Sequence, residues 1–184
     1  MDYDKPLFLM ISYKKNKKFA LKTQSILKDK WDIDCKIIYG YDLNDDNNYK
    51  STNVLFYGVK DKLLPIMVKA KKPIYYIEDD VRFTSNPLNN ISKDIIWSVY
   101  RYGNLNTGKK IIRGSQSIYF SKKAIIYLFS HMTYARAGNI DGYFSKFILD
   151  NSEDLSFEQL NKIGYEEDHI SLISHNWDKY KKPN

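Results

Sequence analysis

Three consecutive carboxylates, Glu78, Asp79 and Asp80, follow the apolar run at residues 74–77, and Val81 then resumes an apolar stretch. If an extended backbone continues through them, Glu78 and Asp80 point to one side and Asp79 to the other. Two carboxylates on one side offer oxygen ligands to a hard divalent cation, Mg²⁺ or Mn²⁺, which would relieve their mutual repulsion. The alternative interpretation is a solvated turn after a strand, because acidic triplets alone are common.

The elements that must position these acids alternate in the first half of the chain. Short apolar runs predict strands at residues 7–12, 36–39, 53–57 and 74–77. Helical spacing predicts helices at residues 17–30 and 60–71. This alternation predicts an α/β fold with a mostly parallel central sheet flanked by helices. Ligands bind such sheets at the carboxyl ends of the strands, which is where the acidic cluster lies.

The second half of the chain is less regular. Its patterns predict a helix at 91–100, strands at 110–113 and 117–120, a helix capped by Ser121, a helix from 140 or 141 through 149, and a last strand within 164–177.

The composition limits the kind of protein and its partners. The chain has 184 residues, enough for one domain with a sizeable core, and a formal net charge of +7, which favours anionic partners. The lysines are scattered, so solvated faces explain most of them. A single cysteine, Cys35, excludes an internal disulfide. Since no apolar run is long enough to span a bilayer, we expect a cytoplasmic protein.

The phrase at residues 76–81, YIEDDV, resembles the acidic DXD-like signature of GT-A glycosyltransferases. It is most similar to the lipopolysaccharide and procollagen galactosyltransferase-like group (glycosyltransferase family 25-like), and small virus-encoded glycosyltransferases of this size also look similar. Other segments fall in the order of that group, at residues 9–13, 38–42 and 114–124. The resemblance implies a GT-A-like single domain over 1–184, with a nucleotide-binding half of about 1–83 and an acceptor half of about 84–184.

The activity that the resemblance implies is transfer of a sugar from a nucleotide diphosphate sugar, with a UDP-sugar as the expected donor, to a hydroxyl of a glycan or protein acceptor. Mn²⁺ or Mg²⁺ would be the cofactor. By analogy, Asp80 binds the metal directly with Glu78 beside it, while Glu78 and Asp79 touch ribose, donor sugar or metal-bound water. A virus-encoded enzyme of this kind would work in the host cytoplasm.

Further site residues also follow from the resemblance. Ser12 and Tyr13 would border the base and ribose with help from Asp42, and His175, with His169 as the alternative, would add a metal contact from near the C-terminus. Asp141 lies where the group carries an acidic residue near the acceptor. It is the candidate general base of an inverting reaction, and a helix N-cap is the competing interpretation.

Two other functions remain open from the sequence. A nucleotidyltransferase also uses acids to hold Mg²⁺ and a nucleotide, although the chain has no Gly-rich phosphate loop. A basic nucleic-acid-binding protein without catalysis would explain the charge and the 16 tyrosines. It leaves the three acids unexplained, because they would repel phosphate.

Overall fold

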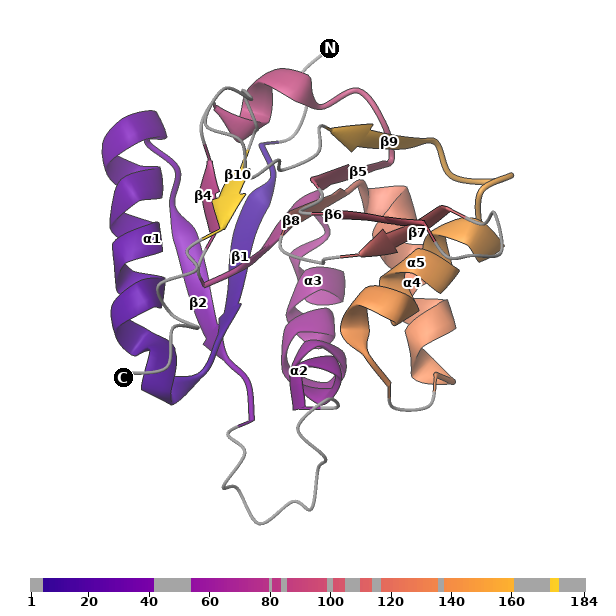
Figure 1. The fold of residues 1–184 in the computed structure, drawn as a ribbon, viewed down its shortest axis with the longest axis horizontal. Helices are drawn as coiled ribbons and strands as arrows, with labels where there is room; N and C mark the ends of the chain where they lie inside the picture. The colour runs from indigo at the N-terminus through magenta and orange to yellow at the C-terminus, as the bar shows by residue number, and fades with distance from the viewer. Residues whose placement is uncertain are drawn as a thin grey trace.

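A six-stranded mixed sheet forms the centre of the computed structural model (Figure 1). Its strands are, in spatial order, β2 (Cys35–Tyr39), β1 (Leu7–Ser12), β3 (Ile74–Glu78), β8 (Ser117–Phe120), β5 (Ile95–Ser98) and β9 (Phe157–Leu160). All neighbouring strands pair in parallel except β8, which is antiparallel to β3 and to β5. The structure describes residues 5–41, 54–79, 81–83, 86–98, 101–104, 110–113, 117–135, 138–160 and 173–175.

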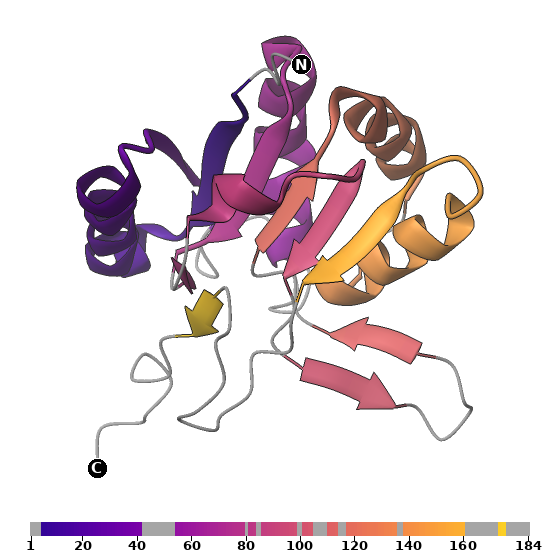
Figure 2. The ribbon, with the colours of Figure 1, turned by 90° about the horizontal axis from the view of Figure 1, so that it is seen from above.

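Helices cover both faces of this sheet, as Figure 2 shows. They are α1 (Lys17–Trp31), α2 (Val54–Tyr57), a π-helical segment (Gly58–Leu63), α3 (Leu64–Ala70), α4 (Lys122–Thr133) and α5 (Ile140–Asp150). On one face, Ala20 and Leu27 of α1 pack against Met10 and Tyr75. The other helices pack on the opposite face, where the buried side chains include Ile11, Tyr76, Trp97, Leu128 and Phe144. The prediction of an α/β fold with a mostly parallel sheet flanked by helices is confirmed.

Two small sheets and two short 3-10 helices complete the described fold. Strand β4 (Val81–Phe83) pairs with β10 (Ile173–His175), and β6 (Arg101–Asn104) pairs with β7 (Lys110–Arg113). The 3-10 helices are Lys14–Asn16 and Pro87–Asn90. Strand β10 lies within the range in which the sequence predicted a last strand.

Two predicted elements are wrong. The predicted strand at 53–57 is helical, because α2 and the π-helical segment extend α3 toward the N-terminus and so bury Val54, Phe56 and Val59. The predicted helix at 91–100 contains strand β5 instead. Both faces of that strand are buried, since Ile95 and Ile96 belong to different core clusters. A short run that is apolar on both faces does not distinguish a strand from a buried helix.

Other local predictions are confirmed. The Ser121 hydroxyl accepts a hydrogen bond from Ala124 N at 3.1 Å, which makes Ser121 the N-cap of α4. The predicted strands at 110–113 and 117–120 are β7 and β8, and the last predicted helix is α5. Among the described residues, no helix is long and apolar enough to cross a membrane.

Candidate functional site

The carboxyl ends of β2, β1 and β3 meet at one edge of the sheet. The register of the parallel pairs places Ser12 beside Tyr39 and Ile11 beside Glu78. Past the end of β2, Gly40 N donates to Ser12 O at 2.8 Å, so the chain after β2 stays attached to β1. The predicted site residues Ser12 and Glu78 are therefore neighbours at the edge where α/β sheets bind ligands.

Asp79 is turned into the protein. Strand β3 ends at Glu78, and the Asp79 residue that follows in a turn is only 3% exposed. Its Oδ2 accepts a hydrogen bond from Ser12 Oγ at 2.8 Å, and its carbonyl oxygen accepts one from Thr23 Oγ1 of α1 at 2.7 Å. These two bonds attach Asp79, and with it the acidic turn that follows β3, to β1 and to α1.

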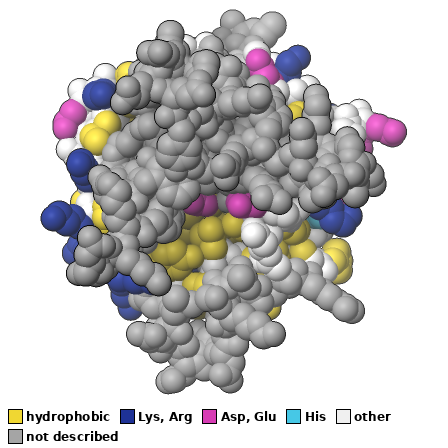
Figure 3. Space-filling model, viewed as in Figure 1, with side chains coloured by type: hydrophobic (Ala, Val, Ile, Leu, Met, Phe, Trp, Pro, Cys, Tyr) yellow, Lys and Arg dark blue, Asp and Glu magenta, His cyan; other side chains and the backbone are white. Residues whose placement is uncertain are grey.

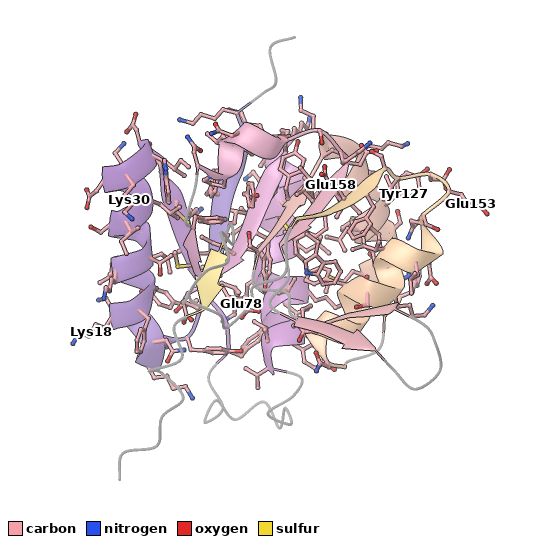
Figure 4. All side chains as sticks on the ribbon, turned by 45° about the horizontal axis from the view of Figure 1, so that its top comes forward. Lys18, Lys30, Glu78, Tyr127, Glu153 and Glu158 are labelled. Atoms are coloured by element: carbon pink, nitrogen blue, oxygen red, sulfur yellow. The ribbon has the colours of Figure 1, made fainter. Side chains whose placement is uncertain are left out.

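Glu78 lies at the border between core and surface. The alternation of β3 puts it on the face of Tyr76, the face that α3 and α5 cover, and the residue is half-buried. Figure 4 shows Glu78 in the middle of the molecule at the end of its strand. In Figure 3, acidic side chains lie next to an apolar area in the middle of the displayed face. Asp80 and Asp42 lie outside the described residues.

Strand β10 brings the C-terminal part of the chain to the acidic turn. It pairs with β4 in antiparallel register, and His175 lies opposite Val81, the residue that follows Asp80 in the sequence. The backbone of His175 is therefore next to the acidic cluster, and His175 was predicted to add a contact to the metal ion at that cluster. The side chain of His175 and all of His169 lie outside what the structure describes, so the metal role of His175 stays a prediction.

The competing interpretation of Asp141, as a helix N-cap, is wrong. Asn139 is the N-cap of α5, because its Oδ1 accepts a hydrogen bond from Asp141 N at 2.8 Å. Asp141 follows in the first turn and is half-buried. Helix α5 begins at the same lower end of the molecule at which β1 and β2 end (Figure 1). The ring of Tyr143 in its first turns packs edge-on against the ring of Phe56 of α2, with 5.4 Å between the ring centroids. The role of Asp141 as a base stays a prediction.

Two observations bear on whether this edge fits a bound metal or polar ligand. Ser117 pairs with Ile77 of β3, and its hydroxyl is fully buried with no hydrogen-bond partner in the described part of the chain. Among the described residues no group of three or more His, Cys, Asp or Glu could hold a metal. Carboxylates of Glu78 and Asp80 with His175 would form a donor set of the kind that Mn²⁺ accepts.

A lysine that the sequence analysis missed lies at the same edge. Lys62 of the π-helical segment donates from Nζ to Gly40 O at 3.1 Å, and its Nζ lies 3.9 Å from the centre of the Tyr41 ring. The approach is close because Gly58 touches Gly40: a Cβ on Gly58 would lie 3.3 Å from Gly40 Cα. The predicted strands at 36–39 and 53–57 end just before these two glycines, and nothing in that pattern predicted the contact between them.

His131 had no predicted role, and it joins α4 to α5. Its Nδ1 lies 2.8 Å from the Tyr143 hydroxyl and its Nε2 lies 3.1 Å from Asp150 Oδ2. Burial, with the nearby charge of Asp150, raises the pKa of Tyr143. Hydrogen bonds from Lys146 and His131 hold the pKa of Asp150 below its usual value. These contacts stabilise the packing of the helix that carries Asp141.

No family model matches the sequence, and no curated protein matches it. Among solved structures, the chain is similar to the CTP:phosphocholine cytidylyltransferase of Streptococcus pneumoniae, with 14% identity, a TM-score of 0.46, and coverage of 90% of this chain and 74% of that one. It is also similar to a glycosyltransferase involved in the glycosylation of the major capsid of PBCV-1, with 14% identity, a TM-score of 0.38, and coverage of 70% and 66%. The function proposed for the chain rests on its own residues.

Proposed function

We propose that the chain is a metal-dependent glycosyltransferase that uses a nucleotide diphosphate sugar. The observation that carries this proposal is the Ser12–Asp79 hydrogen bond, 2.8 Å long and buried. It joins the carboxyl ends of β1 and β3, the kind of edge at which α/β sheets bind ligands, and Glu78 ends β3 at this edge. A solvated turn would not need its central carboxylate buried and bonded to the neighbouring strand.

In this proposal Glu78, Asp80 and His175 hold Mn²⁺ or Mg²⁺. When bound, the cation would supply Lewis-acid stabilisation of the leaving diphosphate. Asp79 acts differently from the role that the resemblance implies, because its carboxylate already accepts a hydrogen bond inside the fold. It positions its two acidic neighbours and does not contact the ligand.

The remaining roles are those that the resemblance implies. The backbone at Ser12 and the Tyr13 side chain border the nucleoside, with Asp42 beside them, and UDP is the expected nucleotide. Asp141 takes the proton of the acceptor hydroxyl as that oxygen bonds to the anomeric carbon and the nucleoside diphosphate leaves. Direct displacement of this kind inverts the anomeric configuration.

The experiment that tests the proposal measures which phosphate product is released. The purified chain is incubated with Mn²⁺ and UDP-glucose, UDP-galactose or GDP-mannose, with lactose or a serine-containing peptide as the trial acceptor. A glycosyltransferase releases the nucleoside diphosphate, by transfer to the acceptor or by slow transfer to water. A nucleotidyltransferase instead releases pyrophosphate from CTP or UTP mixed with a sugar phosphate, and that result would overturn the proposal.

The Asp141→Asn variant tests the assignment of the base. We expect nucleoside diphosphate release to fall about 100-fold, because general-base catalysis contributes at least that much. Donor binding should stay unchanged. Glu153→Gln is the matched control, since it removes an exposed carboxylate just beyond the same helix. Near-normal turnover in Asp141→Asn would exclude Asp141 as the base without changing the donor assignment.

A further inference from the structure

The ammonium group of Lys62 lies at the sheet edge that is proposed to bind the nucleotide, and it contacts a neutral carbonyl and a neutral ring there. Its Nζ contacts the Gly40 carbonyl oxygen at 3.1 Å and the face of the Tyr41 ring at 3.9 Å. In the described part of the chain Lys62 forms no ion pair. A carbonyl and an aromatic face orient an ammonium group without neutralising its charge. The side chain therefore keeps its positive charge and further N–H donors for another group.

A continuous series of hydrogen bonds connects Lys62 to the acidic turn. Lys62 Nζ donates to Gly40 O, Gly40 N donates to Ser12 O, and Ser12 Oγ donates to Asp79 Oδ2. The series crosses the ends of β2, β1 and β3 in that order. Two strand spacings amount to about 10 Å. The fold thus places one cation on the β2 side of the edge and the acidic turn on the β3 side.

The neighbouring lysine of the same segment has a different environment. Lys60 Nζ donates to Thr133 O at 3.3 Å and to Ala135 O at 3.1 Å. Thr133 is the last residue of α4 and Ala135 lies just past its C-cap, where the helix dipole is negative and a cation is stabilised. The end of α4 therefore accounts for the position of the Lys60 ammonium group, whereas the Lys62 ammonium group contacts the end of a strand.

We propose that Lys62 binds the diphosphate of the nucleotide. This inference rests on the proposed function and assigns a second, protein-supplied charge to the same site. The diphosphate would extend from the Lys62 side of the edge toward the acidic turn, with the nucleoside over the end of β1. Lys62 is then a binding residue that distinguishes a nucleoside diphosphate from its nucleoside.

The test compares UDP with uridine on matched variants. Calorimetric titration in Mn²⁺ gives the affinity of each ligand for the wild type, Lys62→Met, Lys62→Arg and Lys60→Met, and GDP with guanosine replaces the pair if UDP does not bind. Met keeps an unbranched stem against Tyr41, and Arg keeps the charge. Melting without ligand shows that each variant is folded.

We expect Lys62→Met to weaken UDP binding about tenfold or more, the usual size for a hydrogen bond to a charged group, and to leave uridine unchanged. Lys62→Arg should restore most of the UDP affinity, and Lys60→Met should match the wild type. Equal losses for UDP and uridine, or no loss, would overturn the inference while the proposed function stands. If neither nucleoside diphosphate binds the wild type, the proposed function fails and the inference fails with it.

Discussion

At the scale of single residues, the proposed site depends on the buried hydrogen bond between Ser12 and Asp79. Replacing Ser12 by Ala removes a donor from a carboxylate that is 3% exposed. We expect the free energy of unfolding to fall by about 1–3 kcal/mol, because a buried charged acceptor loses a partner. Urea unfolding measures the change.

An exposed pair of the same kind supplies the control. Ser25 Oγ donates to Asp29 Oδ2 at 2.8 Å, the same distance as in the buried pair, but on the surface of α1. Ser25→Ala should change the free energy of unfolding by less than about 0.5 kcal/mol. Similar losses in the two variants would mean that the Ser12–Asp79 bond has no special structural role.

At the scale of elements, the π-helical segment and the end of β2 approach closely at Gly58 and Gly40. A Cβ on Gly58 would lie 3.3 Å from Gly40 Cα and 3.6 Å from Ile11 Cδ1. Gly58→Ala should therefore destabilise the fold, by about 1–3 kcal/mol as in other overpacked sites. Gly142 of α5 has no atom within 4 Å of its added Cβ, so Gly142→Ala should stabilise the fold by about 0.5–1 kcal/mol.

Thermal unfolding of the two variants measures this contrast. Opposite signs are the expected result, since helical propensity favours Ala at both positions and only the contact at Gly58 opposes it. Stabilisation of the fold by Gly58→Ala would show that the segment separates from β2 at little cost, and would remove the rigid support of Lys62.

Asp94 joins three elements and gives the stability a predictable dependence on pH. Its carboxylate accepts hydrogen bonds from Ser121 Oγ, Ser156 N and Ser156 Oγ, at 2.8, 3.0 and 2.9 Å. Burial opposes ionisation, but these hydrogen bonds outweigh it and lower the pKa from the ordinary 3.8. Because the pKa is lower in the folded state, the stabilisation is present above pH 3.8 and is lost as the pH falls below it.

The Asp94→Asn variant checks this dependence. Acid unfolding of the wild type should be steeper below about pH 4 than that of Asp94→Asn, which has no carboxylate to protonate at this position. Circular dichroism at fixed urea concentration, recorded from pH 6 to pH 2, follows both transitions. Parallel curves for the two proteins would show that the Asp94 hydrogen bonds do not favour the ionised form.

The elements also show which parts of the fold could be predicted from the sequence alone. The strands at 7–12 and 74–77 were predicted correctly, because each is an apolar run of strand length that polar residues follow directly. The segments at 53–57 and 91–100 were not, since both are short and apolar on more than one side. The acids were found from their position after a strand. The inward orientation of Asp79 could not be predicted, because it depends on Ser12 and Thr23, which lie far away in the sequence.

At the scale of the whole molecule, the net charge of +7 suits an anionic ligand and does not identify it. A nucleic-acid-binding protein would bind DNA or RNA without metal, and its affinity would fall steeply with salt. A glycosyltransferase would bind a nucleoside diphosphate in a way that needs both the divalent cation and the acidic turn. The two functions therefore predict different effects of removing Asp80 on ligand binding: a glycosyltransferase loses it and a nucleic-acid-binding protein keeps it.

The most direct test is a thermal-shift series with UDP, GDP, CDP and ADP, each with and without Mn²⁺, on the wild type and Asp80→Ala. A ligand that binds only the folded protein raises its Tm. We expect the Tm to rise with one nucleotide, UDP being the expected one, and only when both Mn²⁺ and Asp80 are present. A shift that persists in Asp80→Ala without Mn²⁺, or no shift with any nucleotide, would contradict this expectation.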